Sequence, residues 1–244
     1  MNSIFLKDLF KKLEEDNIDY LVLRGYQNLP EKYSHDIDFS VINENELTTF
    51  FNVLHNLSDK YNYSITRDVV RVGLLKVFLH FGNEILKIDV FCSFSYGGLE
   101  YINIDDLHNS KRKSPTNISI PSLNYELAIS LLKEILHNSR IRKDKIGLLR
   151  TQYNKTTFNQ PFIKYFSKKN IDNISISLFS NDKLIFRKVA FSCRLNLFFR
   201  NIKLKGLFCV LNNMMNFTLI KYYNKNKYDK IIIINKIQNE NYRK

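Results

Sequence analysis

Two closely spaced aspartates, Asp36 and Asp38, are the residues of this 244-residue chain whose types and spacing best suit chemistry. They begin an apolar, strand-forming stretch that runs to Ile42. Because side chains alternate along a strand, both carboxylates project from the same face. Carboxylates this close repel each other unless a cation lies between them, and Mg²⁺ prefers such oxygen ligands. The pair therefore predicts a magnesium site.

A third carboxylate, Asp89, fits the same site. It is the only acid in the apolar segment 86–91, which also predicts a strand. The alternative is that each acid lies on a solvated strand edge, where short acidic pairs are common. The apolar neighbours of the first pair argue against this alternative, and so does a predicted strand at 20–24 followed by a turn at Gly25.

This pattern resembles the nucleotidyltransferase superfamily, which includes polymerase beta and the aminoglycoside nucleotidyltransferases. In that family a strand ends in Gly-Ser or Gly-Gly, a loop follows, Asp-x-Asp lies on the next strand, and a third Asp comes later. Here Gly25 precedes Asp36 by 11 positions, and Asp89 lies on a later predicted strand. The resemblance covers about residues 1–95 through these motifs, and the helical pattern extends it to about residue 150. The Leu-Arg-Gly-Tyr sequence of the loop is similar to bacterial relatives found with surface-polysaccharide genes.

The resemblance implies an enzyme that moves a nucleoside monophosphate from a nucleoside triphosphate to a small-molecule, sugar or protein acceptor. It implies two Mg²⁺ ions, with Asp36, Asp38 and Asp89 as both catalytic residues and metal ligands. In this family a helical region often follows the catalytic sheet and helps to hold the nucleotide or the acceptor. The nucleotide-binding residues implied in this way are Arg24, Gly25, Tyr26, Lys133 and Arg140.

Tyr26 departs from the family pattern, because the residue after the glycine is usually small and helps to hold phosphate. A bulky phenol either packs over the loop or blocks the phosphate position. Arg24 could supply charge instead, since guanidinium groups bind phosphate well. Two alternatives to the enzyme therefore stay open: a nucleotidyltransferase-fold binding or regulatory protein without catalysis, and a basic nucleic-acid-binding protein.

The helix and strand patterns that would position these residues predict an α+β fold. We expect a small mixed β-sheet core with flanking helices, followed by a mainly helical C-terminal region. Helical patterns cover 3–15 and 43–57, and strand patterns cover 20–24, 36–42, 62–67, 74–81 and 84–91.

The same sequence patterns predict how the chain is divided into segments. The predicted segments are a catalytic core over 1–110, a linker or exposed loop at 110–116, a helical substrate or partner region over 118–205 and a basic extension over 206–244. The structure of the extension is left open, with Ile231–Ile234 as a short strand or a docked tail. His35 is expected to be structural or exposed.

Charge is unevenly distributed along the chain. The formal net charge is +13, with −7 in residues 1–110 and +20 in residues 111–244. The predicted metal site thus lies in the acidic half, and the basic half suits nucleic acid, an anionic membrane surface or a phosphorylated substrate. The richness in Asn, Lys and Ile weakens the case for nucleic acid, because an AT-rich genome produces the same bias.

Other functional classes lack a motif in this sequence. The three cysteines are scattered without metal-type spacing, which indicates a reducing compartment and a cytoplasmic protein. The seven glycines build neither a Walker-type phosphate loop nor a serine-hydrolase elbow. No apolar stretch is long enough for a transmembrane helix.

Overall fold

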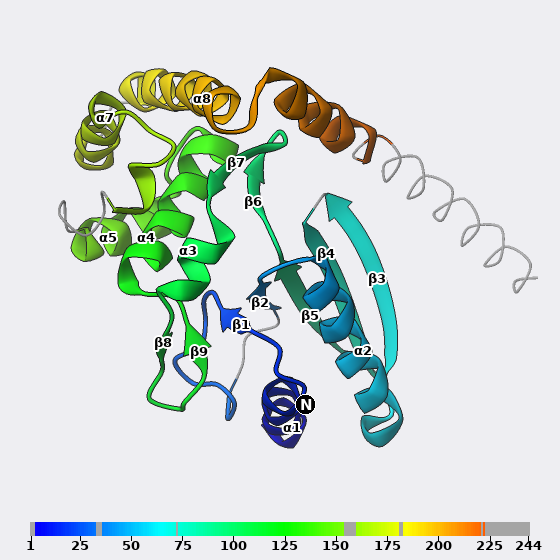
Figure 1. The fold of residues 1–244 in the computed structure, drawn as a ribbon. Helices are drawn as coiled ribbons and strands as arrows, with labels where there is room; N and C mark the ends of the chain where they lie inside the picture. Colours follow the sequence, from blue (N-terminus) through cyan, green and yellow to red (C-terminus); the bar gives the residue numbers. More distant parts are fainter. Residues whose placement is uncertain are drawn as a thin grey trace, which may run out of the picture.

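A five-stranded mixed sheet forms the centre of the N-terminal half of the computed structural model (Figure 1). The structure describes residues 3–32, 36–71, 73–153, 160–180, 183–220 and 222. The predictions for His35 and Ile231–Ile234 lie outside the described residues. The α+β class, with the mixed sheet first and a mainly helical region after it, is confirmed.

The sheet has the strand order β1-β2-β5-β4-β3. Its strands are β1 (Tyr20–Val22), β2 (Asp36–Val41), β3 (Ser64–Arg71), β4 (Leu74–Phe81) and β5 (Glu84–Phe91). The β2–β5 pair is parallel, and the other pairs are antiparallel. In the parallel pair, Asp38 lies opposite Asp89. The hairpin between β4 and β5 turns at Gly82, whose φ of +58° suits a tight turn.

Two helices share a buried apolar cluster with one face of the sheet. They are α1 (Ser3–Glu15) and α2 (Glu44–Tyr61). Ile37 and Phe39 of β2 belong to this cluster. Because side chains alternate along the strand, Asp36 and Asp38 face the opposite side.

The second half of the chain is mainly helical (Figure 1). Its helices are α3 (Ile104–Asn109), α4 (Leu123–Leu132), a π-helical segment (Lys133–Asn138), α5 (Lys143–Gln152), a 3₁₀ turn (Gln160–Phe162), α7 (Lys168–Phe179), α8 (Lys183–Lys205) and a helix over 207–220. Two small hairpins precede α4: β6 (Phe94–Tyr96) with β7 (Leu99–Ile102), and β8 (Arg112–Lys113) with β9 (Ser119–Ile120). The segment 110–116, predicted as a linker or exposed loop, thus contributes a strand of the second hairpin.

The apolar residues of β1 pack on both sides of the sheet. Tyr20 and Val22 belong to the cluster with α1 and α2, whereas Leu21 and Leu23 belong to the cluster of α4, α7 and α8. Leu21 pairs with Ser40 of β2, so it shares the face that carries the aspartates. The helical region therefore packs on the same face of the sheet as Asp36 and Asp38.

Candidate active site

The sheet carries a pair of buried carboxylates on the face toward the helical region. Asp38 and Asp89 lie opposite each other on β2 and β5, and the two residues are only 5% and 7% exposed. Asp36 lies two residues before Asp38 on the same face and is less buried. The three predicted acids thus come from two neighbouring strands and share one face of the sheet.

Each buried carboxylate has one oxygen without a hydrogen bond. Within the described part of the chain, Oδ1 of Asp38 and Oδ1 of Asp89 are buried and have no partner. Leaving a buried polar group unpaired costs about 1–3 kcal/mol. Such groups are rare in native proteins, and a bound ion or a catalytic role is among their explanations. Two unpaired carboxylate oxygens on adjacent strands are suitable ligands for a hard cation.

Arg24 bridges two of the acids. Its Nη2 lies 3.1 Å from Oδ2 of Asp36, and its Nε pairs with Oδ2 of Asp38. Burial alone would lower the pKa of the guanidinium, but Asp38, Asp36 and Asp89 together raise it. The prediction from the sequence assigned Arg24 to phosphate, whereas in this structure it is the cation that compensates the carboxylates.

Lys87 is a second cation at the acids, and it was not among the residues predicted from the sequence. Its ammonium lies 3.0 Å from Oδ2 of Asp89. Lys87 and Asp89 are two residues apart on β5, so strand alternation already placed them on one face and could have identified the pair. Each of the two buried acids therefore has one oxygen paired with a cation and one oxygen unpaired.

Two lysines of the helical region interact electrostatically with Arg24, the cation that bridges the acids. Burial lowers the pKa of Lys133 and Arg24 lowers it further, while Asp38 opposes the shift. The pKa of Lys145 in α5 is lowered by burial, then by Arg142 and Arg24. Both ammonium groups therefore lie within electrostatic range of the Arg24 guanidinium. Lys133 was predicted from the sequence, but Lys145 was not.

Glu134, the residue after Lys133, is the buried partner of Arg142, which precedes α5. Its side chain is fully buried, and its Oε1 accepts a hydrogen bond from Nε of Arg142 at 3.1 Å. It also accepts from the side-chain amide of Asn138 at 3.0 Å. The segment is π-helical, a distortion that often marks functional sites. Arg140, predicted at the nucleotide, is exposed, and no described contact joins its side chain to the aspartates.

The turn after β1 shows why Tyr26 is large. Gly25 has a φ of +72°, a conformation that glycine adopts without strain. Tyr26 is buried, and its hydroxyl donates to Oε2 of Glu126 in α4 at 2.8 Å and accepts from Arg112 at 3.2 Å. Burial and Glu126 raise the pKa of Tyr26 to about 12, so the hydroxyl stays protonated. The ring anchors the turn to the helical region, and its hydroxyl is engaged by protein groups rather than directed at a ligand.

The acids do not form a closed metal cage in this conformation. Among the described residues, no three acidic, histidine or cysteine side chains are close enough together to hold a metal ion. The Arg24 guanidinium lies between Asp36 and Asp38, where a cation is expected. A metal at this position requires Arg24 to move.

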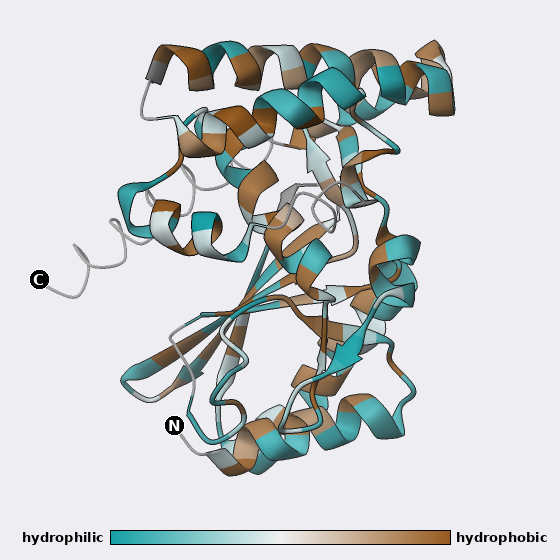
Figure 2. Cartoon of the chain, turned by 90° about the vertical axis from the view of Figure 1, so that its left-hand side faces the viewer, coloured by the Kyte–Doolittle hydropathy of each residue, from teal (hydrophilic) through white to brown (hydrophobic). Residues whose placement is uncertain are grey.

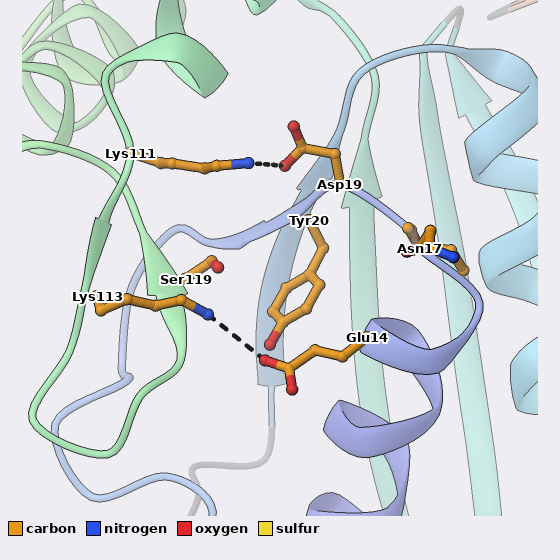
Figure 3. Close-up of a pocket in the computed structure, with 8 residues that line it drawn as sticks. Glu14, Asn17, Asp19, Tyr20, Lys111, Lys113 and Ser119 are labelled. Atoms are coloured by element: carbon orange, nitrogen blue, oxygen red, sulfur yellow. Dashed lines mark hydrogen bonds and ion pairs between the residues drawn. The ribbon is translucent and has the colours of Figure 1, made fainter.

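A separate open pocket of about 360 Å³ lies between the start of β1 and the β8–β9 hairpin (Figure 3). Two ion pairs line it: Lys111 with Asp19 at 2.8 Å, and Lys113 with Glu14 at 3.4 Å. None of the predicted site residues lines it. Because each lysine already faces a carboxylate, the pocket has no excess of one charge to select a ligand.

A buried histidine connects this pocket to β2. Nε2 of His108 lies 3.1 Å from Oγ of Ser40, and Nδ1 lies 3.2 Å from Oδ1 of Asp19. The order matches a serine-hydrolase triad, but Ser40 is fully buried, so its hydroxyl cannot meet a substrate. Burial lowers the pKa of His108, and Asp19 opposes this shift.

Comparisons with protein-family models, curated proteins and solved structures found no match to this chain. In the described part of the chain, no helix combines the length and apolar character needed to cross a membrane.

Proposed function

We propose that this chain is a Mg²⁺-dependent nucleotidyltransferase. One observation carries the proposal: Asp38 and Asp89 lie opposite each other on parallel strands, each with a buried carboxylate oxygen that no described residue engages. Burying two acids side by side is costly unless a cation compensates them. Asp36 on the same face completes the acidic group that the family resemblance leads us to expect.

The chemistry of these donors fits Mg²⁺. Asp38 and Asp89 offer buried oxygens, Asp36 offers a more accessible one, and all are hard ligands. When bound, Mg²⁺ would neutralise the triphosphate and stabilise the attacking and leaving oxygens. This requires the release of Arg24 from the acids.

The remaining groups suit the phosphates. Once released, Arg24 is available to a nucleotide together with Lys133 and Lys145, whose pKa values are lowered by burial and further by Arg24. A cluster of cations facing a cluster of acids matches a substrate that carries phosphates and a metal together. Catalysis then consists mainly of positioning and charge neutralisation.

In the reaction we propose, the acceptor hydroxyl oxygen bonds to the α-phosphorus of the nucleotide, and the bond to pyrophosphate breaks. The carboxylate of Asp89 accepts the hydroxyl proton through the oxygen that it does not offer to the metal ion. Lys133 and Lys145 stabilise the charge on the departing pyrophosphate. The acceptor is a small molecule, a sugar or a protein, and a cytoplasmic location supplies the triphosphate.

A second candidate function is a binding or regulatory protein that keeps the fold without the chemistry. The Arg24 pairs favour it, because an internal guanidinium already does part of the work of a metal. This candidate predicts nucleotide binding without turnover. The enzyme predicts binding with turnover.

The experiment is a label-transfer screen. The full chain is incubated with each of the four α-labelled nucleoside triphosphates and Mg²⁺ or Mn²⁺, and label is scored on protein, RNA and cell-extract metabolites, including sugar phosphates. We expect metal-dependent transfer that Asp38→Asn and Asp89→Asn abolish. Asp59→Asn, the same change at an exposed position of α2, is the matched control. Transfer that persists in both site variants would overturn the proposal, and binding without any transfer would select the second candidate.

A further inference from the structure

The long helix α8 is apolar on two opposite faces. One face buries Phe186, Val189, Cys193 and Leu197 against the helical core. The other face carries large apolar side chains that remain exposed. These are Leu184, Phe191, Leu195 and Phe199, with exposures of 64%, 62%, 45% and 63%. A helix that is apolar on both faces is normally covered on both.

The exposed residues form one stripe along the helix. Their spacing of seven, four and four residues keeps them on the same side of a 3.6-residue turn. Figure 2 shows apolar segments recurring along the helices at the top of the view. The pattern therefore describes a continuous surface rather than scattered exposed residues.

The same character continues into the following helix, over 207–220. Gly206, with a φ of +82°, ends α8 and lets the chain turn into it. Its exposed apolar residues recur at helical spacing, with Phe208 at 87%, Leu211 at 50%, Met215 at 56% and Leu219 at 56%. Figure 1 shows the two helices one after the other along the upper edge of the molecule.

The charge of these helices is uniformly positive. Residues 183–220 contain seven lysines and arginines and no aspartate or glutamate. Arg187, Lys188 and Lys203 are exposed, and Lys188 lies within the stripe, between Leu184 and Phe191 in helical register. The face thus combines large apolar side chains with cations.

We propose that the exposed face of α8 and of the helix over 207–220 docks on an anionic lipid bilayer surface. Helices that lie in the membrane interface bury an apolar face at the level of the headgroups and place lysine and arginine beside anionic lipids. Phe191, Leu195 and Phe199 enter the interface, and Arg187 and Lys188 contact the headgroup charge.

Two other occupants fit the face less well. A second copy packed with two-fold symmetry would bring this patch, and therefore the same cations, against itself. Nucleic acid is held through its phosphates, and a stripe of phenylalanine and leucine makes no phosphate contact. Both occupants are outcomes of the test.

The test is flotation of the full chain with vesicles of phosphatidylcholine alone or of an equimolar mixture with phosphatidylserine. We expect binding to the anionic vesicles only, weakening as salt is raised. Phe191→Ser with Phe199→Ser should weaken binding at least about ten-fold, because buried aromatic area is lost. Arg187→Gln and Lys188→Gln should each weaken it about five-fold.

The matched control is Ile4→Ser with Lys11→Gln, which removes an exposed apolar group and an exposed cation from α1, at the far end of the molecule from α8 (Figure 1). It should bind as the wild type does. Equal binding to both vesicle types, or undiminished binding by the phenylalanine variant, would overturn the proposal. So would a dimer or an RNA complex that the phenylalanine variant abolishes while vesicle binding is absent.

Discussion

Replacing Arg24 with glutamine tests whether this guanidinium substitutes for a metal at the acidic site. The change removes the cation that pairs with Asp36 and Asp38, and leaves Lys87 as the remaining described partner of Asp89. We expect the metal-free variant to be less stable than the wild type, since the carboxylates then repel each other without compensation. We also expect Mg²⁺ to stabilise the variant more than the wild type, because no guanidinium has to be displaced.

The magnitude follows from burial. Removing one partner of a fully buried pair costs about 3–5 kcal/mol, whereas an exposed pair is worth about 0–1 kcal/mol. The Arg24 side chain is 44% exposed and that of Asp36 is 43%, but that of Asp38 is only 7%. We therefore expect a loss of about 1–2 kcal/mol, which for a chain of this size lowers Tm by about 2–8 °C. Mg²⁺ at 100 times its Kd adds about 2.7 kcal/mol, enough to offset the loss.

The assay is thermal unfolding followed by circular dichroism, in EDTA and in a series of Mg²⁺ concentrations. Lys11→Gln, which removes an exposed cation of α1, is the control and should change Tm little in either condition. If Arg24→Gln melts with the wild type in EDTA, Arg24 does not compensate the acids. If Mg²⁺ shifts neither protein, the acids do not bind it.

Three further changes test the rest of the site and its supports. Lys133→Met with Lys145→Met should weaken triphosphate binding at least about ten-fold in calorimetric titration and leave the Mg²⁺ dependence of Tm unchanged, because these lysines face phosphate rather than metal. Tyr26→Phe should cost about 1–3 kcal/mol in chemical denaturation, since it leaves Glu126 without its hydroxyl donor, and should weaken triphosphate binding less than the double lysine change, because it loosens the anchor of the turn but removes no group that faces phosphate. In the folded protein the pKa of His108 lies below its ordinary 6.5, so the stability that His108 contributes is complete above pH 6.5 and is lost as the pH falls through the lowered value. In melts taken between pH 7 and pH 5, the His108→Gln variant should therefore lose less stability than the wild type. An unchanged pH profile of the variant would show that another group titrates.

Strand period accounts for most of what the sequence predicted about the acids. Asp36 and Asp38 share a face because they are two residues apart, and the apolar Ile37 and Phe39 fix which face is buried. The register that sets Asp38 opposite Asp89 could not be read in the same way, because a parallel pair is joined by a long connection and no turn sets its alignment. The sequence therefore predicted the strands, and the fold supplied their alignment.

The parts that the sequence did not predict are those without a periodic signal. Strands β8 and β9 are two residues long, too short to show alternation, so segment 110–116 looked like a loop. Arg112 in that segment turned out to support Tyr26. Lys145 is 12 positions from Lys133 and reaches the same site only because a bend separates their two helical segments.

The structure gives a structural role to Tyr26, the residue that departs from the family pattern. From the sequence it was a large residue at a position where phosphate is usually held. In the structure its hydroxyl lies in a network with Glu126 of α4 and Arg112 of β8, which ties the turn after β1 to the helical region. That region carries Lys133, so the anchor also fixes the distance between the acids and their helical cations. A small residue would leave this distance to other contacts. Tyr26 thus positions the turn relative to the helical region, and catalysis is tested by variants of the aspartates and of Arg24.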